Sequence, residues 1–385
     1  MAFLDNFLSA FKGGEQSRVP LAPGYFQGWT PAFEGAPRAR HFEYTSAVQG
    51  SFLSNPVAQR AVRIVAEGVG QAPLTSNDPQ LTALVTATSA GQSLIETLAA
   101  QILLHGNGFV QIIKDASGKP IELFALRPDR VKVEAGGDGW PCALEYSVSG
   151  QKVHVPLEDE DGWPGAIQIK AMHPLEDHYG AGALAAAMQA VAIHNAAAEW
   201  NRALLENAAR PSGALVYDTG DGAGLTADQF ERLKSELADA FSGAGNAGRP
   251  MLLDGGLKWQ SMALSPADMD FATLKSAAAR EIALAFGVPP MLLGLPGDNT
   301  YSNYREANRA LWRLTLLPLA DKLFSALREG LAPWFPEATL AIDLDQVTAL
   351  SEDRERLWKQ VSDAEFLTRA EKRRMLGLPE EEESQ

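Results

Sequence analysis

Residues 181–210 constrain the fold of this chain more than any other segment. Half of the residues from 181 to 200 are alanine, and the run ends at Arg210-Pro211. Alanine is the strongest helix former, and a helix over this segment, at about 1.5 Å per residue, would be a rod of about 45 Å. Because small side chains let helices approach closely, the segment predicts a long helix that packs along other helices.

A second rod is predicted from 265 to 287. Ser265 suits the N-cap, Pro266 suits the first helical position, and the segment stops at Gly287-Val288-Pro289-Pro290. Its apolar residues recur at helical spacing and form one stripe: Phe271, Leu274, Ala278, Ile282 and Ala285. Between the two rods the sequence predicts a compact insertion, with a strand at 213–217, a helix at 226–241, a glycine-rich loop at 242–250, and strands at 251–253 and 257–263.

Residues 46–178 mix helical and strand patterns. Apolar residues at helical spacing predict helices at 56–69 and 92–104. Short runs between glycine-rich turns predict strands at 109–113, 121–126, 131–134, 144–148, 152–155 and 166–170. The sequence therefore predicts an α+β fold with a meandering, largely antiparallel sheet.

The two ends of the chain have simpler patterns. Residues 2–12 have one apolar helical face, and residues 13–45 read as an extended arm because of Pro20, Pro23, Pro31 and Pro37. After a loop at 288–301, a third long helix is predicted from Ser302 to about Gly330, with a kink at Pro318. A strand at 339–344, a charged helix at 351–376 and an acidic tail complete the chain.

Charge and cysteine content exclude several classes of protein. The net charge is −15, from 33 basic and 48 acidic residues, which disfavours a protein that grips nucleic acid through phosphate contacts. An acidic wall that repels phosphate remains suitable for a conduit past which DNA slides. The single cysteine, Cys142, excludes an intrachain disulfide and a cysteine zinc site. No apolar run suggests a membrane span, and the first residues lack a basic leader, so we expect assembly in the cytoplasm.

Two strings in the chain resemble binding motifs. The string 243–250 has the glycine spacing of a phosphate loop, but Arg249 and Pro250 stand where Lys and Ser or Thr are needed. His173, Glu176, Asp177 and His178 could in principle bind a divalent metal, which would make a metal-dependent hydrolase the alternative function. A polar loop between strand and rod is the preferred interpretation of these four residues, and we expect neither catalytic residues nor a cofactor.

Three arginines form a basic ridge on the third long helix. Arg305, Arg309 and Arg313 recur at every fourth position. Pairing with acids of the same or a neighbouring subunit is one explanation. Contact with DNA phosphate, with Arg305 as the candidate residue, is the other.

Several strings in the chain resemble the portal protein family of tailed bacteriophages, in the branch of long-tailed phages and gene transfer agents. These strings are Asn55-Pro56-Val57, Leu126-Arg127-Pro128-Asp129-Arg130-Val131, Asn207-Ala208-Ala209-Arg210-Pro211-Ser212-Gly213, Phe286-Gly287-Val288-Pro289-Pro290 and Asn299-Thr300-Tyr301-Ser302-Asn303. The resemblance covers nearly everything after residue 45. It implies a non-enzymatic ring of twelve subunits, through which double-stranded DNA passes without sequence specificity. It also implies contacts with the major capsid protein, a terminase large subunit that hydrolyses ATP, and a head–tail adaptor, in a virion or phage-like particle without a membrane.

The resemblance also implies a division of the chain: an α/β wing, a two-helix stem, a small α/β clip, a long wing helix and a short helical crown. The corresponding ranges are 1–45 for an N-terminal helix and arm, 46–180 for the wing, 181–210 and 265–287 for the stem, 211–264 for the clip, 288–302 for the tunnel loop, 303–344 for the long wing helix and return strand, and 345–385 for the crown. The implied channel constriction is Gly297, Asp298, Asn299, Thr300 and Tyr301. The implied partner-binding loop of the clip holds Gly243, Gly245, Asn246, Gly248 and Arg249.

Overall fold

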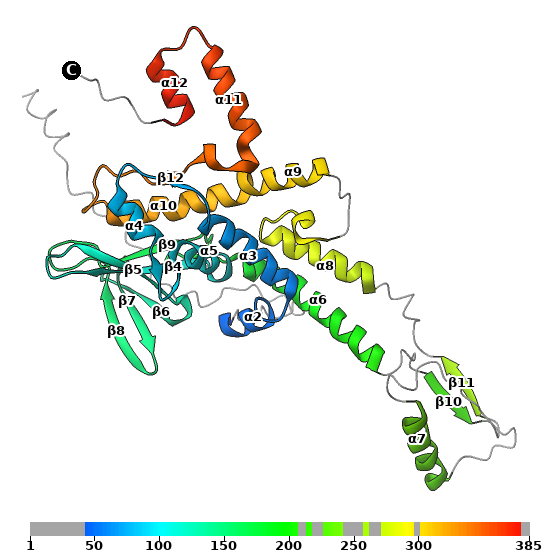
Figure 1. Ribbon diagram of the computed structural model, residues 1–385. Coiled ribbons are helices and arrows are strands. Elements are labelled where there is room, and N and C mark those ends of the chain that lie inside the picture. The colour runs from blue at the N-terminus through cyan, green and yellow to red at the C-terminus, as the bar shows by residue number, and fades with distance from the viewer. Residues whose placement is uncertain are drawn as a thin grey trace, which may run out of the picture. The chain divides into compact units, whose positions relative to one another are not determined.

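The computed structural model describes residues 43–206, 213–217, 226–241, 257–261, 271–295 and 301–378 (Figure 1). Its fold is mixed, mostly helical with small antiparallel sheets, which confirms the predicted α+β class. Contacts between residues divide the chain into two compact units. The sheet unit includes Gly70–Gly182 and Ala320–Ile342, and the helical unit is made of Glu43–Val69, Ala183–Leu319 and Asp343–Gln385.

The sheet unit holds most of the strands. Its helices are α4 (Pro79–Thr86), α5 (Leu94–His105) and most of α10 (Leu317–Leu331). Its strands are β1 (Leu74–Thr75), β2 (Thr88–Ser89), β3 (Gln92–Ser93), β4 (Asn107–Lys114), β5 (Pro120–Leu126), β6 (Val131–Ala135), β7 (Pro141–Val148), β8 (Gln151–Pro156), β9 (Ala166–Lys170) and β12 (Ala341–Ile342). All six strands predicted between 109 and 170 are present.

The expected single meander is instead two three-stranded antiparallel sheets, in the orders β5-β4-β9 and β6-β7-β8. β9 pairs with β4 and not with β8, its neighbour in sequence. The start of β4 is buried on both faces, from Asn107 to Val110, so it is a central strand with a partner on each edge. The two sheets share a core that includes Phe109, Leu126, Val133, Leu144 and Val155.

The helical unit holds the long helices. Its elements are α2 (Tyr44–Gly50), α3 (Pro56–Gly70), α6 (Ala183–Glu206), β10 (Gly213–Tyr217), α7 (Ala227–Phe241), β11 (Leu257–Ser261), α8 (Phe271–Ala285), η3 (Pro290–Leu293), α9 (Tyr301–Leu311), the π-helical turn η4 (Trp312–Leu316), η5 (Leu344–Gln346), η6 (Thr348–Leu350), α11 (Ser351–Asp363) and α12 (Arg369–Leu376). Buried Asn55 caps α3, because its Oδ1 accepts the backbone N–H groups of Val57 and Ala58, each at 3.0 Å.

The two predicted rods pack along each other as α6 and α8 (Figure 1). Buried alanines lie on both helices, including Ala187 and Ala190 on α6 and Ala278 and Ala279 on α8. Trp200 of α6 stacks on Phe271, the first residue of α8, with ring centroids 5.9 Å apart. The close approach expected from alanine is therefore already present within one protomer.

Substitution of Ala187 tests this packing. Its side chain is 1% exposed, so we expect Ala187→Leu to overpack the helical unit and lower the free energy of unfolding by about 1–3 kcal/mol. Chemical denaturation followed by far-UV circular dichroism measures the change. Ala186→Leu adds the same side chain at the exposed neighbouring position and should leave the free energy unchanged. Equal effects of the two substitutions would contradict burial of Ala187.

The third predicted helix contains an irregularity near its middle. α9 continues through η4, a π-helical turn, into α10, and Pro318 is the second residue after this turn. Proline has no N–H and its ring crowds the preceding turn, so a wider turn relieves the conflict. The predicted kink is thus a π-turn. Leu316, its last residue, is buried and packs against Gly68 of α3.

The C-terminal region differs from its prediction in two places. The strand expected over 339–344 is only two residues long, β12. The single helix expected over 351–376 is two helices, α11 and α12. Thr368 starts α12 through a capping box: its hydroxyl accepts the N–H of Glu371, and the Glu371 carboxylate accepts the N–H of Thr368. These two bonds favour a new helix start over continuation of α11.

Candidate functional site

The loop between α8 and α9 has a well-defined beginning. Gly287 ends α8 with a φ of +66°, and Gly294 ends η3 with a φ of +72°, both in the left-handed region that glycine favours. The hydroxyl of Thr315, in η4, donates a hydrogen bond of 2.7 Å to the carbonyl of Gly287. The chain is thereby fixed at the end of α8, from where Pro290–Leu293 leads into the loop.

The predicted constriction lies mostly outside the described residues. This applies to Gly297, Asp298, Asn299 and Thr300. Tyr301 is described only as the first residue of α9. The predicted partner-binding loop of the insertion, from Gly243 to Arg249, is also outside them. Three of the elements predicted around that loop are present, since β10 pairs antiparallel with β11 and α7 lies between them in sequence, whereas the strand predicted at 251–253 lies outside the described residues.

The arginine ridge on α9 is paired with carboxylates. Arg305 lies 2.9 Å from Glu352 of α11, and Arg309 lies 2.8 Å from the same carboxylate. Arg309 also contacts Glu306 at 3.0 Å and Asp353 at 3.4 Å. The first explanation of the ridge, pairing with acids, therefore holds for both residues within one subunit. The two guanidinium groups line a cavity of about 300 Å³.

Arg309 is the centre of this cluster. Its side chain is only 16% exposed, whereas that of Arg305 is 47% exposed. Three carboxylates surround Arg309, so this residue joins α9 to the first turn of α11. Arg313, the third residue of the ridge, is exposed and has no ion-pair partner in the described part of the chain. Arg305 is both paired with Glu352 and exposed to solvent, and of the three arginines it is the nearest in sequence to the loop between α8 and α9.

The four residues of the metal hypothesis do not converge. The Nδ1 of His173 accepts the N–H of Leu175 at 3.1 Å, and a Glu176 oxygen accepts the N–H of His178 at 3.1 Å. The ring of His178 is buried, with its Nε2 3.1 Å from the carbonyl of Gly139. Within the described ranges, no cluster of three or more His, Cys, Asp or Glu side chains could hold a metal ion. The hydrolase alternative was therefore wrong in its metal site, because both histidine rings and the Glu176 carboxylate have separate local partners.

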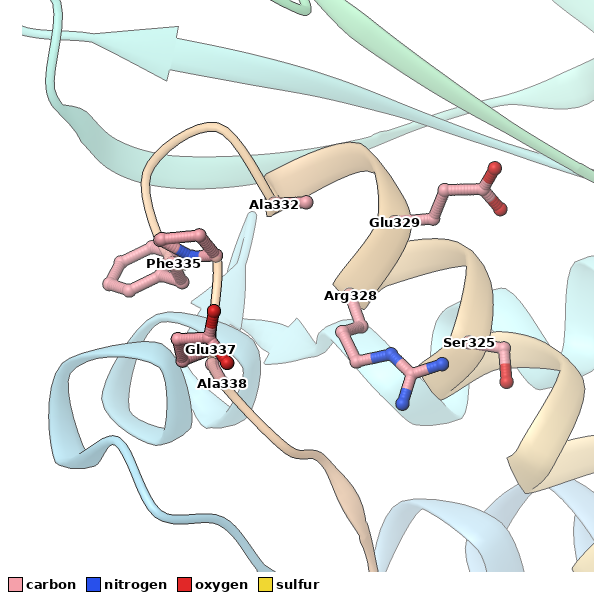
Figure 2. A pocket seen from close by; sticks show the side chains of 8 residues that line it. Ser325, Arg328, Glu329, Ala332, Phe335, Glu337 and Ala338 are labelled. Carbon is pink, nitrogen blue, oxygen red and sulfur yellow. The ribbon is translucent and has the colours of Figure 1, made fainter.

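A polar recess of about 410 Å³ lies at the C-terminal end of α10 (Figure 2). Ser325, Arg328 and Glu329 line it from the helix, and Phe335 and Glu337 line it from the following loop. Arg328 and Glu329 are exposed to solvent, and the lining residues include no nucleophile paired with a base. The recess therefore offers no catalytic arrangement. None of the helices described is long and apolar enough to span a bilayer.

Comparison with known proteins identifies the family. A family model for phage portal proteins matches residues 56–377. The chain is 38% identical over 346 residues to an uncharacterized protein of Rickettsia bellii, covering 86% of this chain and 88% of that protein. It is 46% identical to a chain in the neck of a native gene transfer agent particle solved with C12 symmetry, with a TM-score of 0.68 and coverage of 89% and 95%.

A second solved structure supports the fold. An HK97-family phage portal protein from Corynebacterium diphtheriae has a TM-score of 0.56 over 78% of this chain and 94% of that chain. At 18% identity this likeness concerns the fold alone. Because the family model covers nearly all described residues, from α3 to the end of α12, the chain belongs to the phage portal protein family.

Proposed function

We propose that this chain forms a twelve-subunit portal ring at one vertex of a phage-like or gene transfer agent capsid. The ring is the channel for packaging and ejection of double-stranded DNA. The observation that carries the proposal is the 46% identity, over 89% of the chain, to a chain in a particle neck with C12 symmetry. Portal proteins are structural and not enzymes.

The proposed parts of the subunit follow from the order of elements. The antiparallel pair of rods, α6 and α8, supports the two-helix stem, and the β10–α7–β11 insertion between them supports the clip. The fixed base of the 288–302 connection supports the tunnel loop, with residues 297–301 as the constriction. The helices α11 and α12 are the proposed crown.

The proposed partners are those that a DNA channel needs. The clip loop, with Gly243, Gly245, Asn246, Gly248 and Arg249, would meet the terminase large subunit during packaging and the head–tail adaptor afterwards. The wing would meet the major capsid protein. DNA would pass without sequence readout, since the net charge of −15 repels phosphate along most of the wall. Arg305 is the proposed DNA-facing residue, for which phosphate would compete with Glu352.

Electron microscopy of the purified chain tests the proposal. We expect negative-stain images to show rings of about twelve subunits with a central hole, the symmetry of the related particle neck. Size-exclusion chromatography with light scattering gives the mass of the same sample. A chain that stays monomeric at high protein concentration, and is absent from the vertex of assembled particles, would contradict the proposal.

A further inference from the structure

The sheet unit contains an aromatic cleft that the portal function above does not use. The cleft has a volume of about 300 Å³. We call it the tryptophan cleft; its lining residues are Lys114, Ser117, Gly118, Lys119, Asp159, Asp161, Trp163 and Trp334. It lies where the β4–β5 turn, the loop between β8 and β9, and the loop after α10 meet.

Two indole rings form the apolar part of the cleft. The centroids of Trp163 and Trp334 are 5.1 Å apart, and the ring planes are tilted by 39°. The indole N–H of Trp334 donates a hydrogen bond of 2.9 Å to the carbonyl of Gly118. Trp163 is 39% exposed, and in the described part of the chain its indole N–H has no acceptor. The cleft thus combines one fixed indole with one that is available as a donor.

Asp159 holds this arrangement in place. One carboxylate oxygen accepts the backbone N–H of Trp163 at 2.8 Å and that of Asp161 at 3.1 Å. The other accepts Lys114 Nζ at 2.7 Å, and the same ammonium lies 5.2 Å from the ring centroid of Trp334. The hydrogen bond from Lys114 is the main reason that the pKa of Asp159 is lowered, so the carboxylate stays ionised at neutral pH. The cleft is therefore preorganised.

The lining of the cleft carries two lysines and two aspartates. Lys114 pairs with Asp159, and Lys119 keeps its positive charge while its ammonium donates to the neutral side chain of Gln80 at 2.9 Å. The Asp161 carboxylate also lines the cleft, and no described residue pairs with it. Two aromatic rings, a free indole donor and a free carboxylate are suited to a polyproline II segment that carries an arginine. Prolines pack on the rings, a peptide carbonyl accepts the indole N–H, and the arginine meets the acid.

The chain itself contains such a segment. Residues 18–23 read Arg18-Val19-Pro20-Leu21-Ala22-Pro23, with two prolines at the spacing of a polyproline ligand and an arginine before them. This segment precedes the first described residue, Glu43, by 20 or more positions, which is enough chain to span tens of ångströms. We propose that residues 18–23 bind in the tryptophan cleft, with Arg18 paired to Asp161.

Radical footprinting of the full-length chain tests this interaction. Hydroxyl-radical oxidation of Trp163 and Trp334, quantified by mass spectrometry, should rise several-fold in the double variant Pro20→Ala/Pro23→Ala. The double variant Pro31→Ala/Pro37→Ala is the matched control, because it removes the same number of prolines from the same arm but leaves residues 18–23 intact. It should oxidise at the wild-type rate. Equal oxidation in all three proteins, or an equal rise in both variants, would overturn the proposal.

Limited trypsin digestion tests the interaction from the side of the arm. Cleavage after Arg18 should become several-fold faster in Trp163→Ala and in the milder Asp161→Asn, whereas cleavage after Lys12 should not change. Circular dichroism shows whether each variant keeps its fold, and Asp161→Asn retains both indoles if Trp163→Ala does not fold. If cleavage after Arg18 is unchanged in a folded Asp161→Asn protein, the proposed ion pair between Arg18 and Asp161 does not form. Neither measurement requires DNA packaging, so the result is separate from the portal function.

Discussion

Replacement of Gly180 by alanine should destabilise the sheet unit by about 3 kcal/mol or more, among the largest effects of any single substitution in this chain. A Cβ atom at Gly180 would lie 2.6 Å from the nitrogen of Ala171 and 2.7 Å from its oxygen, and closer still to the carbonyl oxygen of Gly106. All three neighbours are backbone atoms, which cannot rotate away. The segment that leads into α6 would have to separate from the start of β4.

The bonds at this crossing explain why separation is costly. Asn107 is fully buried, and its side chain accepts the N–H of Gly180 at 2.8 Å and donates to the carbonyl of Gly180 at 3.3 Å. The N–H of Ala171 donates to the carbonyl of Gly106 at 2.8 Å. If the two segments moved apart, the buried amide of Asn107 would lose both bonds, and unpaired buried polar groups cost about 1–3 kcal/mol each.

Thermal and chemical unfolding measure this effect. Gly137→Ala is the matched control: Gly137 is exposed, and a Cβ there would have no neighbour within 4 Å. We expect that control to change the free energy of unfolding by less than about 0.5 kcal/mol. A Gly180→Ala protein as stable as the control would show that the two segments can relax at no cost.

Deletion of residues 296–300 should preserve rings and abolish the packaging or retention of full-length DNA. This expectation depends on the proposed tunnel loop. The ends of the loop are held by the Gly287–Thr315 bond on one side and by α9 on the other, so the residues between them can be altered without loss of either helix. DNase-protected DNA in assembled particles measures packaging, and negative-stain images measure ring formation.

A control separates the loop's chemistry from its length. Replacement of residues 296–300 by the same number of Gly and Ser residues keeps the length of the loop and removes the side chains of Asp298 and Asn299. If the constriction acts through its side chains, this variant should also fail to retain DNA. If it acts by length alone, the variant should package normally. Normal packaging by the deletion itself would show that the loop does not gate the channel.

Much of the fold could be predicted because its signals are local. The alanine-rich rod, the Asn55-Pro56 helix start and the glycine-bounded strands each depend on residues close in sequence. Two local signals were nonetheless missed. Asp78-Pro79 starts α4, with the Asp78 carboxylate accepting the N–H groups of Gln80 and Leu81. Thr368 with Glu371 starts α12. Both are standard N-terminal patterns, and recognising them would have corrected the prediction.

Other features depend on contacts that sequence spacing does not reveal. β9 pairs with β4 across more than fifty residues, and that choice reflects burial of β4 on both faces. The acid that pairs with Arg305 and Arg309 is Glu352, far along the chain. Trp163 and Trp334 meet only because separate loops converge. Four possible metal ligands occur within 173–178, and local hydrogen bonds direct three of them, His173, Glu176 and His178, to different partners.

The π-turn makes the long helix unequally tolerant of insertions and deletions. A π-turn contains one residue more than the α-helix would need, and each residue advances a helix by about 100°. Because the wide turn absorbs this extra residue, removal of one residue between 312 and 315 would restore regular helical hydrogen bonding and leave α9 close to its present orientation about Leu316, which packs against Gly68. Removal of a second residue would rotate α9 by about 100°, and Arg305 and Arg309 would then point away from Glu352. Among relatives of this chain, helix length before Pro318 should therefore vary by the one residue that the π-turn absorbs or by whole turns, or change together with the acids of α11.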